Sequence, residues 1–90
     1  MIPRTINVLG REYKIRRKRM KFWAYVDDDA ATIWLRSGLS GDVAAQTLLH
    51  ELIHAIMFRS GNKFQLNPEL EESIVRALEH GIHQAGYRLM

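Results

Sequence analysis

The sequence predicts an α+β fold: a small antiparallel or mixed sheet of three to four strands, packed on a central helix and a C-terminal helix. Two observations support this prediction. The first 36 residues contain short segments rich in β-branched and aromatic residues, separated by turn signals. The rest of the chain contains two long helical patterns with helix start signals. Because the strands precede the helices instead of alternating with them, the pattern favours α+β.

Four segments have the composition of strands. Gly10 separates the first two, which predicts a hairpin. Asp27 to Asp29 separate the last two, and aspartate favours tight turns, so we expect these strands to pair antiparallel. We expect the aromatic residues of the third segment to feed a small core. The segments are residues 5–9, 12–17, 22–26 and 31–36.

The first helix is predicted over residues 42–59. Ser40 is the best candidate for its N-cap, and Gly61 is the expected stop. Apolar residues cover most of its circumference, which is typical of a central helix. We therefore expect it to pack on the sheet on one side and on the last helix on the other.

A second helix is predicted from Pro68 to about Gly86, after a short connector that ends in a capping residue, Asn67. Acidic residues in its first turn favour a helix start. Its expected apolar stripe consists of Leu70, Ile74, Val75, Leu78 and Ile82.

Length and composition limit the classes of protein to consider. Ninety residues suffice for one domain, which we place at residues 1–90. The chain has no cysteine, so disulfides and thiolate zinc sites are excluded. No segment resembles a membrane helix or a signal peptide. We therefore expect a cytoplasmic protein that does not bind membranes.

The first helix contains the motif H-E-x-x-H, formed by His50, Glu51 and His54. Residues four apart lie on one face of a helix, so both imidazoles can bind one zinc ion. The intervening Glu51 is then placed to remove a proton from a metal-activated water. The motif predicts a zinc site with Glu51 as general base.

A catalytic zinc usually has three protein ligands and an open fourth position. The pattern HExxHxxGxxH is excluded here, because Met57 and Ser60 replace its glycine and third histidine. A carboxylate from the last helix is the alternative, since the short connector turns that helix back towards His54. Periodicity favours Glu72 over Glu71 only slightly, and a histidine remains an open alternative. The acidic candidates are Glu69, Glu71 and Glu72.

Two stretches together resemble a known family. HELIHAI, followed by E-x-x-V-x-x-L-x-x-G from Glu72 to Gly81, is similar to small zincin metallopeptidases. More narrowly, it resembles minimal gluzincins of the ImmA/IrrE type, including short phage- and prophage-encoded members. The resemblance covers residues 25–85. It implies a zincin-like fold, a bacterial host cell, zinc ligands His50, His54 and Glu72, and Glu51 as base.

The resemblance also implies a substrate and a place for it. We expect a zinc-dependent endopeptidase that acts on a protein or peptide, with residues 31–35 as the sheet edge along which the substrate lies. Besides zinc, the oxyanion needs a donor, for which sequence offers Arg76, His80, His83 and Tyr25. Asp42 or Glu79 can orient a zinc-binding histidine. The resemblance implies that larger members of the family carry additional domains, which we do not expect within these 90 residues.

A basic segment from Arg11 to Lys21 supports an alternative function. With a net charge of +3, the chain can meet an acidic partner. The alternative is a non-catalytic zinc-binding module whose basic hairpin contacts nucleic acid or an acidic protein. We favour the peptidase, because a charged segment is usually a solvated face.

Overall fold

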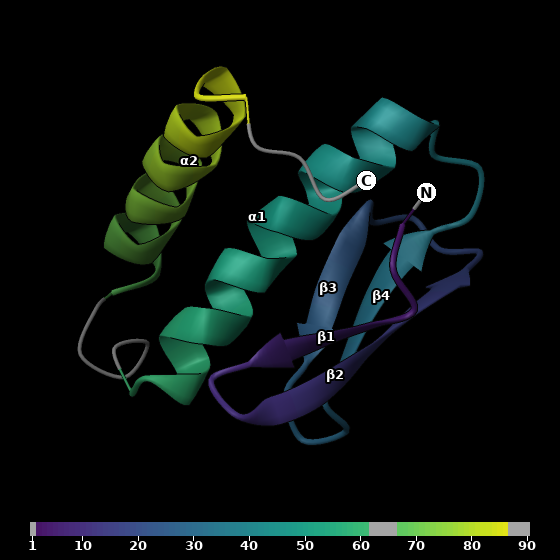
Figure 1. The fold of residues 1–90 in the computed structure, drawn as a ribbon, viewed down its shortest axis with the longest axis horizontal. Coiled ribbons are helices and arrows are strands. Elements are labelled where there is room, and N and C mark those ends of the chain that lie inside the picture. Colours follow the sequence, from purple (N-terminus) through teal and green to yellow (C-terminus); the bar gives the residue numbers. More distant parts are fainter. Residues whose placement is uncertain (1, 62–66, 87–90) are drawn as a thin grey trace.

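The computed structural model describes residues 2–61 and 67–86. Its sheet forms one layer, α1 lies across one face of the sheet, and α2 packs on the other side of α1 (Figure 1). This arrangement confirms the predicted α+β class and the central position of the first helix. The elements are β1 (Thr5–Val8), β2 (Arg11–Lys18), β3 (Ala24–Asp27), β4 (Thr32–Arg36), α1 (Gly41–Arg59) and α2 (Pro68–Gln84).

The sheet is mixed, with strand order β1-β2-β4-β3. The β1–β2 hairpin and the antiparallel pairing of β3 with β4 confirm two predictions. The expectation that residues 31–35 form the sheet edge is wrong, because β4 pairs in parallel with β2 on its other side. Ile33 and Leu35 are fully buried, as expected for an interior strand. The edge beside β4 is therefore β3.

The β1–β2 hairpin turns through Leu9 and Gly10, which both have positive φ angles, of 49° and 93°. Positive φ at both turn residues gives the twist that a two-residue hairpin requires. Asn7 stabilises the turn, since its Oδ1 accepts a hydrogen bond of 2.9 Å from the Gly10 N–H.

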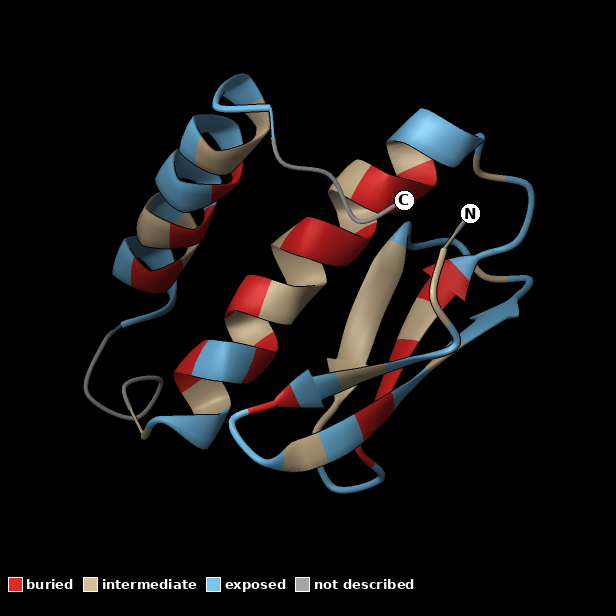
Figure 2. Cartoon of the chain, in the orientation of Figure 1, coloured by how far each residue is buried: buried red, intermediate tan, exposed pale blue. Residues whose placement is uncertain are grey.

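One face of the sheet packs on α1 and forms the main core (Figure 2). Tyr13 is completely buried there, and its hydroxyl donates a 3.0 Å hydrogen bond to Asp28 Oδ1. Burial and the contact with Asp28 raise the pKa of Tyr13. The buried cluster consists of Val8, Tyr13, Ala31, Ile33, Leu35, Leu48 and Ala55.

The two helices start differently. Ser40 is the N-cap of α1, as predicted, but its side chain makes no capping hydrogen bond. Asn67 caps α2, with its Oδ1 accepting a 2.7 Å bond from the Leu70 N–H. Gly61 follows α1 with a φ of 83°, as its predicted stop. Most of the predicted connector, residues 62–66, lies outside the described residues.

The predicted apolar stripe of α2 is partly wrong. Leu70 and Leu78 are 47% and 46% exposed, whereas Val75 is fully buried. Glu71 and Glu79 are buried on either side of Val75, one helical turn before it and one after. Two carboxylates of α2, and not the two leucines, therefore face α1. Both carboxylates bond to histidines of α1.

Phe22 and Trp23 also depart from expectation. They precede β3 and are 70% and 57% exposed, so the prediction that they feed the core is wrong for both. Tyr25 lies in β3, half-buried, and the Lys18 ammonium donates a 2.6 Å hydrogen bond to its hydroxyl. Among the helices described, none has the length and apolar character needed to cross a membrane.

Candidate metal centre

The HExxH motif lies in the middle of α1, where the sheet and α2 both contact the helix. His50 and His54 are one turn apart, and their ring centroids are 5.0 Å from each other. Both side chains are partly accessible, with 23% and 18% of their surface exposed. Packing of Leu49 and Ile53 against Val75 of α2 fixes the helix face that presents the two rings.

Glu72 of α2 lies opposite both imidazoles. Its Oε1 is 2.9 Å from His50 Nε2, and its Oε2 is 3.1 Å from His54 Nε2. His50, His54 and Glu72 each offer a ligand atom within 4.8 Å of the others, so this group can hold a metal ion. Of the three acidic candidates, the structure brings Glu72 to this place. Glu69 is exposed, and Glu71 has another position.

Two further carboxylates contact the outer nitrogens of the histidines. His50 Nδ1 lies 2.7 Å from Glu79 Oε1, and His54 Nδ1 lies 2.6 Å from Glu71 Oε2. A carboxylate at Nδ1 fixes the ring orientation and keeps the N–H there, so that Nε2 is free to bind a metal. Glu79 was one of two predicted orienting residues, and Asp42 was the other. The sequence did not predict that Glu71 orients His54, although Glu71 and Glu79 lie on the same helix face as Val75.

Gln46 completes the surroundings of Glu79. Its side-chain amide donates a 2.9 Å hydrogen bond to Glu79 Oε2. Burial acts to raise the pKa of Glu79, but the hydrogen bonds to His50 and Gln46, together with the charges of His50 and His80, outweigh it, and the pKa is lowered. The carboxyl of Glu79 is therefore held as an anion beside His50.

The charges around the two rings fit a bound cation. A neutral imidazole has one N–H, yet each ring here meets carboxylate oxygens at both nitrogens. At Nε2, two acceptors repel each other unless a proton or a metal ion lies between them. Nitrogen and oxygen ligands of a tetrahedral zinc, at about 2.0–2.2 Å from the metal, are about 3.3–3.6 Å apart. The observed separations of 2.9 and 3.1 Å are somewhat shorter than that spacing.

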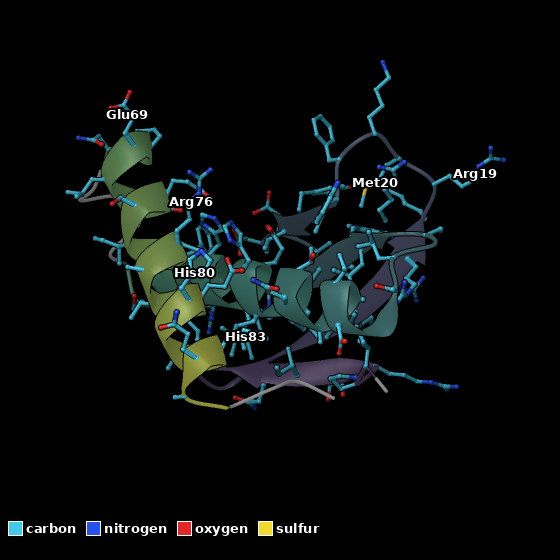
Figure 3. The ribbon with its side chains drawn as sticks, turned by 90° about the horizontal axis from the view of Figure 1, so that it is seen from above. Arg19, Met20, Glu69, Arg76, His80 and His83 are labelled. Carbon is cyan, nitrogen blue, oxygen red and sulfur yellow. The ribbon has the colours of Figure 1, made fainter. Side chains whose placement is uncertain are left out.

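An open cavity of about 860 Å³ gives access to this group. Glu51, the predicted base, lines the cavity together with His50 and Glu72. Of the predicted oxyanion donors, Arg76 alone is in the lining formed by the described residues, with its Nε 3.5 Å from Glu72 Oε1. Figure 3 labels Arg76 on α2, followed by His80 and His83 further along the helix.

The other lining residues come from two elements besides α2. Phe22 and Trp23 directly precede β3, Ala24 is its first residue, and Val43, Gln46 and Thr47 belong to α1. Apolar surface beside a few converging polar groups is typical of a ligand site.

Comparison of the chain with protein-family models, with curated proteins and with solved structures finds no match, so the case for a metal centre rests on the geometry of α1 and α2.

Proposed function

We propose that this chain is a zinc-dependent metallopeptidase of minimal gluzincin type, with His50, His54 and Glu72 as metal ligands and Glu51 as general base. One observation carries the proposal. The nitrogens of an HExxH motif and a carboxylate from a second helix converge, and the glutamate of the motif lines the same open cavity. Zinc is the metal that such a donor set commonly holds, although other divalent ions accept it.

Each residue of the proposed site has its own role in peptide hydrolysis. Zinc bound there would polarise the substrate carbonyl and lower the pKa of a water to about 7. Glu51 would take a proton from the attacking water as the water oxygen bonds to the carbonyl carbon, and would give that proton to the amine nitrogen as the C–N bond breaks. Glu71 and Glu79 hold the two imidazoles in the orientation that ligation needs.

An extended peptide has a route to the centre along β3. This strand is at the edge of the sheet, and its first residue, Ala24, lines the cavity. A peptide can add to an edge strand through main-chain hydrogen bonds. In this proposal β3 takes the place that the sequence assigned to residues 31–35.

Replacement of Glu51 by Gln tests the proposal. Gln keeps the size of the side chain but cannot accept a proton, so cleavage should fall by about 10²- to 10⁴-fold. Zinc content, measured by mass spectrometry of the purified protein, should stay the same. Glu69→Gln is the matched control, since Glu69 is an exposed residue of α2 outside the cavity lining. Undiminished cleavage by Glu51→Gln would overturn the mechanism.

Arg76 is the candidate for stabilising the oxyanion. Its side chain is 69% exposed and reaches the cavity beside Glu72. If it donates to the transition state, Arg76→Ala should lower kcat by about 10²- to 10³-fold with little change in KM. Arg59→Ala, at the exposed end of α1, provides the control. A rise in KM alone would instead assign Arg76 to ground-state binding.

A second candidate function is nucleic-acid binding by the sheet. Alternate residues of β2 point away from the buried Tyr13, and these are the exposed Glu12, Lys14, Arg16 and Lys18, of which the last three are cations. The helices cover only the opposite face (Figure 1). Lys18 Nζ also lies 4.5 Å from the centroid of the Trp34 ring, on the neighbouring strand. Cations of this kind favour the phosphate backbone.

Binding of single-stranded oligonucleotides at several salt concentrations tests this candidate. Replacing Lys14, Arg16 and Lys18 by Gln should reduce the salt dependence, while Glu51→Gln should leave it unchanged. Binding that is weak and independent of these cations would exclude the candidate. The peptidase proposal further expects the triple variant to cleave a short peptide at the normal rate.

A further inference from the structure

Two adjacent aromatic residues line the metal-site cavity without belonging to the core. Phe22 and Trp23, here called the aromatic rim, are 70% and 57% exposed. Neither packs in the two buried clusters. The described residues contain other exposed large apolar side chains, but only the aromatic rim lines the cavity.

The backbone beneath the aromatic rim is held in place by the sheet. The Trp23 carbonyl accepts a 2.7 Å hydrogen bond from the Arg36 N–H, and the next residue, Ala24, pairs with Leu35. The chain therefore cannot turn these rings into the core without breaking the end of the β3–β4 ladder. Their exposure at this place is a property of the fold.

The cavity has two unlike walls. The aromatic rim and Val43 make one wall apolar, and Val43, Thr47 and Glu51 follow one face of α1 at intervals of one turn. The opposite wall, on α2, carries Glu72, Arg76 and Glu79. Glu51, the proposed general base, follows Thr47 by one turn of α1 and lines the same cavity.

From this arrangement we infer that the aromatic rim and Val43 bind one bulky apolar side chain of the peptide, adjacent to the bond that is cleaved. The inference rests on the proposed function and adds the class of substrate. Aromatic and aliphatic side chains remove the exposed rings from water, which is favourable. An acidic side chain would instead meet the negative charges of the three glutamates around the histidines.

Cleavage of a mixed peptide library, sequenced by mass spectrometry, tests the inference. The zinc-loaded wild type should prefer Phe, Leu, Met or Trp at one position beside the cut. Phe22→Ala and Trp23→Ala together should lower kcat/KM for those peptides by about 10-fold or more. Peptides with Ala at that position should lose less than about twofold. Leu78→Ala, which removes an exposed apolar side chain outside the cavity, should leave the preference unchanged.

A binding measurement separates this inference from the peptidase proposal. Zinc-loaded Glu51→Gln can be titrated by calorimetry with short Gly/Ala peptides that carry one central Phe, Leu, Ala or Asp. Tighter binding of Phe and Leu peptides, lost on removal of the aromatic rim, supports the inference even if the wild type cleaves nothing. Equal affinities, or a preference that survives the double replacement, overturn it. Cleavage without side-chain preference overturns the inference and leaves the proposed function standing.

Discussion

The two helices that meet at the candidate metal centre are attached to the protein in different ways. α1 is buried between the sheet and α2, whereas α2 contacts α1 and has only one fully buried apolar residue, Val75. The remaining buried residues of α2 are Glu71 and Glu79, both bonded to histidines of α1. Apolar packing thus holds α1, and polar contacts at the candidate centre hold much of α2. The buried residues of α1 are Ala44, Ala45, Leu48, Leu49, Ile53, Ala55 and Met57.

The largest loss of stability should come from truncating a buried side chain of α1. Leu48 is completely buried against the sheet, so Leu48→Ala should lower the free energy of unfolding by about 2–5 kcal/mol. Leu78→Ala, on the exposed side of α2, should change it by less than about 0.5 kcal/mol. Urea denaturation measures both. Similar losses for the two variants would contradict the distinction between the helices.

Zinc should stabilise α2 more than the sheet. A metal that binds only the folded site adds about 2.7 kcal/mol to stability at 100 times its Kd. Because Glu72 would then connect α2 to the histidines, hydrogen exchange of the α2 amides should slow on addition of zinc. The amides of β2 and β4 should change little. Equal protection of sheet and helix would mean that the metal acts on the whole fold.

Replacing the carboxylates that orient the histidines should have the next largest effect, which is on zinc affinity. Glu71→Gln and Glu79→Gln should each weaken zinc binding by about 10- to 100-fold, because a neutral amide holds the imidazole less firmly. Competition with a chromogenic chelator measures the affinity, with Glu69→Gln as control. Unchanged affinity in both variants would show that their contacts with His54 and His50 serve packing alone.

Replacing the N-cap residues of the two helices should have the smallest effect on stability. Asn67→Ala removes the capping bond to the Leu70 N–H and should cost about 1 kcal/mol. Ser40→Ala should cost less, because the Ser40 side chain makes no such bond. Thermal unfolding of both variants provides the measurement. A larger loss for Ser40→Ala would reverse the expected order.

Much of the fold could be predicted because local patterns determine it. The HExxH spacing predicted which residues share a face of α1, and the turn signals predicted the hairpin. The sheet order could not be predicted in the same way, because the parallel pairing of β2 with β4 joins segments that are not neighbours in the chain. The edge position expected for residues 31–35 came from the resemblance to zincins, and no local pattern indicated the pairing that contradicts it.

The candidate centre shows a second limit of sequence patterns. Periodicity places Leu70 and Leu78 on the buried stripe of α2, yet both are exposed, and Glu71 and Glu79 are buried beside the histidines of α1. It also left Glu71 and Glu72 nearly equivalent, although they have different places beside the two rings. Which side chain is buried here depends on a partner on another helix, and the pattern of a single helix contains no information about that partner.

The candidate ligands and their orienting carboxylates all lie in one continuous stretch of chain, from α1 to α2. In kinetic terms, the helical hairpin can bring them together by closing one short loop. The sheet, by contrast, must bring β4 between β2 and β3 before its central pairs can form. Metal capture therefore need not wait for the sheet, and zinc present during refolding should speed the docking of the two helices.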